Sequence, residues 1–441
     1  MTKGFEQLAR RTAEVHGVPD LALAVYPGVI MTDGGEELRD KVEKTMVAQV
    51  LLGLTGHLQI VSGQAEPEQR DIVIQGAFDE VQEFFMRNLW TEGLPIVPPT
   101  PERVERFLRF TDRSPEEVIG VLGPENREAT VWNVAVNGVI AGCRPEYMPV
   151  LLAVVDTISD PELCVHEAGG TPGPEPMIML NGPIIKELDF NCGQGVMKVG
   201  RQANTSVARF LKLYMRNIAG LRIGTFDKGT IGYTYNLVLA ENEDVVADLG
   251  WQPFSVDQGF QSGDNVVTVR SIRAVTAPIY SAGSTARECA EAIADILGPT
   301  CSYSTHLGLK YRNFHPFVVI SPSIAHVLVR DGWTKTHLRE FLYKNCKTTA
   351  TAVDKWLWRI GHTDFSLARM LEAGEAPEGF AGTNANRLVP VFPQADQIGI
   401  VIAGDPDRNQ ARGYVPNHPP PVSRKIELPG RWKALLESTS R

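Results

Sequence analysis

Apolar residues recur at helical spacing in two stretches near the start of the chain. Residues 5–17 and 34–56 both predict helices, each of which ends at a glycine. Between them, residues 21–27 (LALAVYP) form a short apolar run that predicts a buried strand. A single strand cannot form a sheet. We therefore expect residues 1–60 to be a fragment of an α/β layer that the main domain or a partner chain completes.

Further along the chain, apolar runs of strand length alternate with amphipathic helical patterns. Helices are predicted over residues 79–90, 101–110, 129–142, 147–158, 203–220, 286–297, 324–332 and 334–346. Buried strands are predicted over residues 176–184, 233–240, 265–272, 316–322 and 397–406, with a closing edge over 416–429. This alternation is typical of an α/β protein, and we expect mixed sheets with flanking helices.

The same patterns divide the chain into five parts. Residues 1–60 predict the partial α/β domain, and residues 61–87 predict a linker followed by a helix. Residues 88–345 are expected to form the main α/β domain, which holds the substrate. Residues 346–390 predict a helical and polar insertion or lid, and residues 391–441 supply a last strand and the closing edge.

Composition narrows the class of protein. The 441 residues carry a net charge of −9 and no long basic run, which argues against binding to nucleic acid or to an anionic membrane. The longest apolar run, MPVLLAVV, is far shorter than the roughly 20 residues that a membrane span needs. The start of the chain has no apolar signal segment, and the six cysteines contain no CxxC pair. We expect a soluble, cytoplasmic protein with reduced thiols.

Cys143 is the first candidate for chemistry. Pro149 cannot lie inside a helix that starts at Pro145, so the pattern predicts a tight turn before the true helix. Cys143 would then precede a helix N-terminus beside Arg144, and both features would lower the pKa of its thiol. The alternative is a small buried residue that fills a corner of the core.

A glycine-rich stretch before the helix over 203–220 is the second candidate. Backbone N–H groups at such a position can hold an anion, and we expect Gly193, Gly195 and Gly200 to do so. Arg201 and Asn204 would pair with a carboxylate or phosphate. The stretch is neither a dinucleotide fingerprint nor a P-loop. The alternative is a glycine-rich connector without a ligand.

Other candidates are weaker. Glu241 ends an apolar strand, where catalytic carboxylates often lie, although an exposed acidic turn also explains it. Ser284 stands at a helix start and is a substrate-binding candidate, although an N-cap at this position explains the pattern as well. Cys164, His166 and Glu167 could together bind a metal ion, although two soft ligands are few for zinc and a hydrogen-bonded surface histidine is the alternative.

Several motifs together resemble one family. EGLPIVPPT, AGCRPEYMPVLLAVV, NGPI, the glycine stretch ending in GRQAN, and AEN are similar to the large C-terminal region of the UGSC-type proteins. These bacterial proteins are named for a selenocysteine- or cysteine-containing redox motif in an N-terminal α/β domain. The resemblance covers roughly residues 5–60 and 88–345. The chain contains no such redox motif, and Cys192 with VMKVGRQAN replaces the usual glycine loop.

The resemblance implies the catalytic large subunit of a heteromeric enzyme whose smaller α/β subunit carries the missing half. It implies thiol-dependent chemistry that makes or breaks a carbon–heteroatom bond in a small polar or anionic molecule. Cys143 and Cys192 would supply thiols and Glu241 would be an acid or base. The anion would be held by Arg144, Asn181, Gly193, Gly195, Gly200, Arg201, Asn204 and Ser284.

Two alternatives stay open. One is a hydrolase or lyase that needs no redox partner and uses the same thiol or a metal ion. The other is a non-catalytic binding or scaffold subunit of a two-component system. The complex with the smaller α/β subunit could itself form a homo-oligomer. No flavin or nicotinamide site is visible, so no cofactor is firmly implied and only a metal ion remains open.

Overall fold

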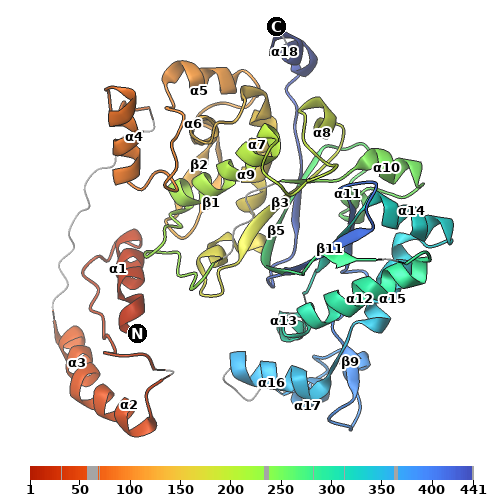
Figure 1. Cartoon of the computed structure of the whole chain (residues 1–441). Coiled ribbons are helices and arrows are strands. Elements are labelled where there is room, and N and C mark those ends of the chain that lie inside the picture. Colours follow the sequence, from red (N-terminus) through yellow and green to blue (C-terminus); the bar gives the residue numbers. More distant parts are fainter. Residues whose placement is uncertain are drawn as a thin grey trace.

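The computed structural model describes residues 1–30, 32–56, 68, 70–232, 238–281, 283–311, 313–361 and 366–439. Its centre is a mixed sheet of eight strands, in which β10-β7-β11-β5-β3-β4 form a continuous path and β6 and β12 pair with β11 and β5 (Figure 1). The strands are β3 (Glu175–Asn181), β4 (Leu239–Ala240), β5 (Val266–Val275), β6 (Ile279–Tyr280), β7 (Phe317–Ile320), β10 (Gly399–Ile402), β11 (Gln410–Pro416) and β12 (Val422–Lys425). The predicted α/β class with a mixed sheet and flanking helices is confirmed.

Two groups of helices cover the outer face of this sheet (Figure 1). The helices α6 (Val131–Ile140), α7 (Met148–Ile158) and α9 (Gln202–Tyr214) pack into one apolar cluster with outward side chains of β3 and β5. The helices α12 (Ala286–Ser302), α14 (Pro322–Arg330) and α15 (Lys335–Asn345) pack into a second cluster with outward side chains of β7, β10 and β11. The strands β7 (FVVI) and β10 (GIVI) are continuous apolar runs, because both of their faces are buried.

The other face of the sheet is concave and has its own core. Its cluster takes at least one side chain from each of the six strands on the path, among them Met177, Leu239 and Tyr414. The two edges of the path meet, because the N–H of Asn242, just after β4, donates to the carbonyl of Ile402 in β10 at 2.7 Å. The two edges of the path therefore approach each other at this point, and the sheet is strongly curled.

Smaller elements surround this body. Two antiparallel strand pairs were not predicted: the hairpin β1 (Val118–Leu122)–β2 (Arg127–Thr130), and β8 (Lys347–Thr349) with β9 (Leu388–Pro390), between which α16 (Ala350–Gly361) and α17 (Leu367–Glu372) lie. After residue 56, the other described α-helices are α4 (Phe78–Arg87), α5 (Pro101–Leu108), α8 (Ile184–Glu187), α10 (Glu243–Asp248), α11 (Phe254–Asp257), α13 (Thr305–Tyr311) and α18 (Trp432–Thr439). The predicted strand over 233–240 is seen only as β4, since residues 233–237 lie outside the described residues. No helix among the described residues is long and apolar enough to cross a membrane.

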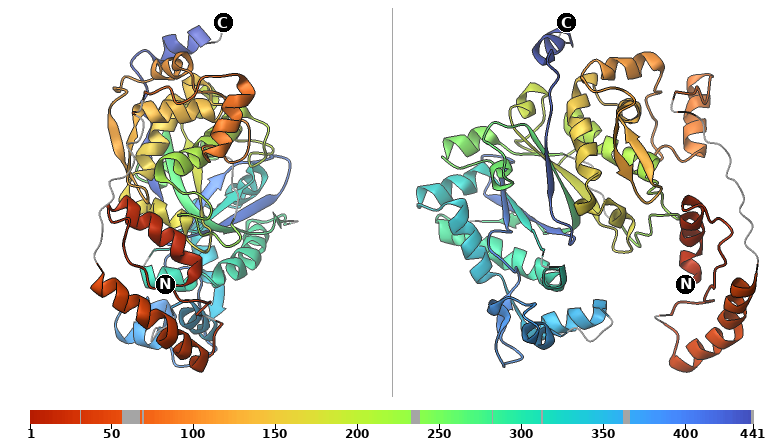
Figure 2. Two further views of the ribbon diagram at one scale, coloured as in Figure 1. Left: turned by 90° about the vertical axis from the view of Figure 1, so that its left-hand side faces the viewer. Right: turned by 180° about the vertical axis from the view of Figure 1, so that it is seen from behind.

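The N-terminal prediction needs a correction. Residues 1–56 contain α1 (Glu6–Val15), α2 (Gly35–Lys41) and α3 (Val47–Thr55), but the expected strand over 21–27 is wrong. This segment makes one isolated bridge to Thr2, and the Val25 N–H donates to the side chain of Gln49 in α3 at 2.6 Å. It is extended alongside a helix, and among the described residues only the start of the chain pairs with its backbone, too briefly for a ladder. Figure 2 shows α2 and α3 standing outside the layered body.

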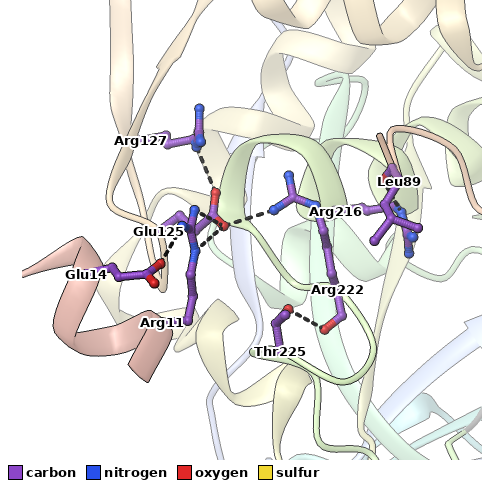
Figure 3. A network of polar contacts seen from close by, with 8 residues as sticks. All are labelled: Arg11, Glu14, Leu89, Glu125, Arg127, Arg216, Arg222 and Thr225. Carbon is purple, nitrogen blue, oxygen red and sulfur yellow. Dashed lines mark hydrogen bonds and ion pairs between the residues drawn. The ribbon is translucent and has the colours of Figure 1, made fainter. Parts of the chain in front are cut away.

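An arginine-rich network ties α1 to the main body (Figure 3). The buried Glu125 accepts hydrogen bonds from Arg11 of α1 at 2.9 Å, from Arg222 at 2.9 Å and from Arg127 at 2.8 Å. Burial by itself raises the pKa of Glu125, but the charges of Arg222, Arg11 and Arg127 outweigh burial and hold the pKa below its usual value. One carboxylate thus joins three segments that are distant in the sequence.

Candidate functional site

A cavity of about 630 Å³ opens where the parallel strands β3 and β4 end. The residues that line it include Lys186, Cys192, Glu241, Glu243 and Trp251. The carboxyl ends of parallel strands are a common place for ligand sites in α/β sheets, because the strands stop there and loops take over. The cavity is lined by both apolar and charged groups, as small-molecule sites usually are.

A second, larger cavity lacks the reactive side chains found at the first. It measures about 970 Å³ and lies between residues 70–76 and α6, where Trp90 and Trp132 line it. Among the described residues that line it there is no thiol and no buried carboxylate. We therefore place the candidate site at the ends of β3 and β4.

Glu241 is the most buried charged group at the cavity, with 1% of its surface exposed. Its Oε2 accepts from the Asn181 side chain at 2.7 Å and from the Phe254 N–H at 2.6 Å. Its Oε1 accepts from the Ile402 N–H at 3.2 Å and lies 3.8 Å from the Lys335 ammonium group. The sequence predicted Glu241 at a strand end, and the alternative of an exposed acidic turn is wrong.

Burial raises the pKa of Glu241 above the usual 4.5. The charge of Lys335 and the hydrogen bonds from Phe254, Asn181 and Ile402 oppose this effect without cancelling it. A carboxyl group with a raised pKa that lines a cavity has the properties of a general acid or base.

Asn181 connects Glu241 to a second carboxylate. Its Nδ2 also donates to Oε1 of Glu243 at 2.8 Å, and the Gly182 N–H donates to the same oxygen at 2.8 Å. Gly182 has φ 102°, and a Cβ there would lie 2.5 Å from the Asp264 carbonyl. Only glycine fits this turn, so the NGPI motif sets the turn that follows β3.

Cys192 lines the same cavity and is half-buried. Its carbonyl accepts from the Gly404 N–H at 3.0 Å, which fixes it beside the turn after β10. Burial raises the pKa of the Cys192 thiol, so this sulfur is protonated at neutral pH.

The glycine loop is held by Asn204. The Asn204 side chain accepts from the Asn191 N–H at 2.8 Å and donates to the carbonyls of Asn191 at 3.0 Å and Val238 at 2.8 Å. These three hydrogen bonds occupy the side-chain amide of Asn204 and position the loop beside β4. Gly193, Gly195 and Gly200 follow Cys192 but are not among the residues that line the cavity.

The prediction for Cys143 holds for the local backbone but not for the pKa of its thiol. The tight turn is confirmed as a 3₁₀ turn over Pro145–Tyr147 followed by α7, with Pro149 in its first turn. The predicted lowering of the thiol pKa is wrong, however, because burial raises the pKa of Cys143 to about 12 and the neighbouring Ser206 and Arg209 offset little of it. Cys143 belongs to the apolar cluster around α6, α7 and α9, where the cost of burying a thiolate exceeds the benefit of the helix end.

Three other candidates lie away from the cavity. Arg144 pairs with Glu146, and Arg201 pairs with Asp189 at 2.6 Å on the surface. Ser284 donates its N–H to Glu288 at 2.8 Å in the cap of α12, for which Thr285 is the N-cap. None of the three is among the residues that line the cavity.

The proposed metal set is contradicted. Across the described part of the chain, no group of three or more His, Cys, Asp and Glu side chains is placed to hold a metal ion. Glu167 instead lies 3.2 Å from Nε2 of His418 and accepts from Asn417 at 2.9 Å. The Cys164 thiol faces the carbonyl of Pro161 at 3.5 Å. Glu167 and Cys164 therefore have partners within the protein.

Lys335 and Glu243 belong to the site but were not predicted. Glu243 follows Glu241 by two residues, so the acidic pattern after the strand was a usable signal. Lys335 begins α15, and its ammonium group donates to the Gln252 carbonyl at 2.6 Å. Nothing local in the sequence places it near Glu241.

Comparisons with protein-family models, curated proteins and solved structures find no match for the chain.

Proposed function

We propose that the protein is an enzyme that makes or breaks a carbon–heteroatom bond in a small polar substrate bound in the cavity of about 630 Å³. The observation that carries this proposal is the buried carboxyl group of Glu241, held by three N–H donors at the wall of a cavity that also exposes the Cys192 thiol. Geometry of this kind supports acid–base catalysis by a lyase or a hydrolase.

Glu241 is the proton-transfer group in this proposal. In an elimination it would take a proton from the carbon next to the one that loses the heteroatom. In a hydrolysis it would take a proton from the attacking water. The fixed donors of Phe254 and Ile402 hold the carboxyl group in place, and the Lys335 ammonium at 3.8 Å stabilises its ionised form. Such positioning lowers the cost of reaching the transition state.

Cys192 contacts the substrate in this proposal as a neutral thiol. Its raised pKa means that the reaction does not depend on a thiolate formed before the substrate binds. This favours the redox-independent alternative over a reaction driven by Cys143, whose thiol is buried in the core.

The experiment screens small hydroxy, amino and thio acids for release of ammonia or thiol, or for formation of a new double bond. Glu241→Gln should lower kcat/KM by roughly 10²- to 10⁴-fold, which is the usual contribution of a general acid or base. Cys192→Ala should weaken turnover, and Cys164→Ala is the matched control, since that thiol lies outside the cavity. Full activity of folded Glu241→Gln would overturn the proposal.

A smaller partner subunit remains part of this proposal. Its support is the apolar surface of α3, which has no buried residue in this chain. Leu51, Leu52 and Leu54 are exposed there, with Leu54 at 79%. Apolar surface of this extent on one helix commonly marks an interface.

A further inference from the structure

The concave interior of the sheet holds an arginine that has no counter-charge among the described residues. Arg270 lies in the middle of β5, opposite Met177 of β3, and only 3% of its surface is exposed. Its Nε and Nη1 atoms are buried and have no hydrogen-bond partner. Among the described residues, no carboxylate forms an ion pair with it.

Aromatic rings, which carry no net charge, flank the guanidinium group. Its Cζ lies 4.9 Å from the ring centre of Phe317 and 5.3 Å from that of Phe254. Gly399 gives it room, because a Cβ at that position would lie 3.4 Å from Nη1 and 2.8 Å from the Phe317 Cβ. Ring faces attract a cation but supply no hydrogen-bond acceptor in the plane of the guanidinium group.

The nearby histidine does not compensate for this charge. Burial, with a smaller effect of the Arg270 charge, lowers the pKa of His315 to about 4, so the imidazole is neutral at physiological pH. Burial also lowers the pKa of Arg270 to about 9, which leaves the guanidinium group charged near neutral pH. A buried charge without a partner is strongly unfavourable, and proteins normally supply a counter-charge.

We propose that the interior of the curled sheet binds a small oxyanion, a carboxylate or a phosphate, on the guanidinium group of Arg270. An oxyanion accepts charge-assisted N–H bonds from a guanidinium group, and both Nε and Nη1 of Arg270 carry N–H groups without an acceptor. The anion would displace no bond of the protein, since neither atom makes one. Arg270 is not among the residues that line the cavity, so this site is separate from the one proposed for catalysis.

Phe254 places the two sites next to each other. Its backbone N–H donates to Glu241 at 2.6 Å, and its ring stacks over Arg270. An anion at Arg270 would therefore act on the element that also holds Glu241. The inference itself does not depend on any role of Glu241.

The test compares thermal unfolding of the full chain in inorganic phosphate, in acetate and in chloride at equal ionic strength and pH. We expect the midpoint to rise with phosphate or acetate concentration until the site is filled, as binding to the folded state requires. A rise in phosphate alone identifies a phosphate site, and a rise in acetate alone identifies a carboxylate site. The same dependence in chloride, or none in either oxyanion, would overturn the inference.

Two variants make the test specific. Arg270→Met keeps an unbranched side chain and should lose the saturable rise, whereas Arg201→Met removes an exposed arginine and should keep it. Glu241→Gln should also keep the rise, which separates failure of this inference from failure of the proposed function. If Arg270→Met does not fold, equilibrium dialysis of labelled phosphate or acetate against the wild-type chain decides. One bound anion per chain supports the site, and no bound anion overturns it.

Discussion

The side-chain amide of Asn181, at the end of β3, donates to Oε2 of Glu241, at the end of β4, across 2.7 Å. The same Nδ2 donates to Oε1 of Glu243 at 2.8 Å. One amide therefore links two carboxylates and fixes both at the end of the parallel strand pair. In the proposed function Asn181 is a positioning residue, because it would act on the substrate through Glu241.

Removal of this amide should change the titration of Glu241. In Asn181→Ala the ionised carboxylate loses a hydrogen bond that stabilises it, so its pKa should rise further. The acidic limb of kcat/KM should then move to higher pH, because a general base works only when ionised. Asn345→Ala removes an amide of an exposed helix end and should leave the profile unchanged. An unchanged profile in Asn181→Ala would contradict the positioning role.

The cysteines should differ in their reaction with iodoacetamide. Cys192 is half-buried at the cavity, so we expect it to be alkylated in the folded protein with a pH midpoint above the usual 9.0 of a thiol. Cys143 should remain unlabelled until the protein unfolds, because it lies in the core. Peptide mass spectrometry over a pH series measures both. Rapid labelling of native Cys143 below that pH would restore it as a reactive thiol.

The network around Glu125 should make stability depend on pH. The folded-state pKa of this carboxyl group is lowered, so its contribution is present above about pH 4.5 and is lost as the pH falls through the folded pKa. Glu125→Gln should lower the free energy of unfolding by roughly 1.5–3 kcal/mol near neutral pH, because three partly exposed arginines lose the buried carboxylate that they share.

Denaturant unfolding at several pH values measures this effect. The loss in Glu125→Gln should be large at neutral pH and should shrink toward low pH, where the wild-type carboxyl group is protonated. Glu14→Gln is the control, since that glutamate is half exposed and should change stability by no more than about 0.5 kcal/mol. An equal loss at every pH would show that the effect is packing and not charge.

The apolar surface of α3 should cause self-association when its partner is absent. Leu52 and Leu54 are largely exposed, so the isolated chain should form concentration-dependent assemblies through them. The double variant Leu52→Gln, Leu54→Gln should scatter light as a particle of 48.5 kDa at all concentrations. A wild-type chain that stays at that mass throughout would remove the support for a partner on this helix.

Local patterns predicted the central elements well. The predicted strands over 176–184, 265–272, 316–322 and 397–406 become β3, β5, β7 and β10, and the position of Pro149 correctly placed the start of α7. The strand over 21–27 failed because its apolar residues pack beside α3, and a strand needs a neighbour that sequence pattern cannot supply. The environment of a side chain was harder to predict from the sequence than the helices and strands were. Cys143 is enclosed by α6, α7 and α9, and Lys335 reaches Glu241 across 94 positions, so both depend on tertiary packing.

The most direct test of the proposed site is the titration of Glu241 itself. Protein labelled with ¹³C at the glutamate carboxyl carbons gives one resonance that Glu241→Gln removes, and NMR follows that resonance over pH. We predict a midpoint above 4.5, since burial outweighs the charge of Lys335 and the three N–H donors. A midpoint at or below 4.5 would mean that the N–H donors and Lys335 outweigh the effect of burial on the pKa. Glu241 would then be a structural anion that joins β4 to β10, and the acid–base proposal would be wrong.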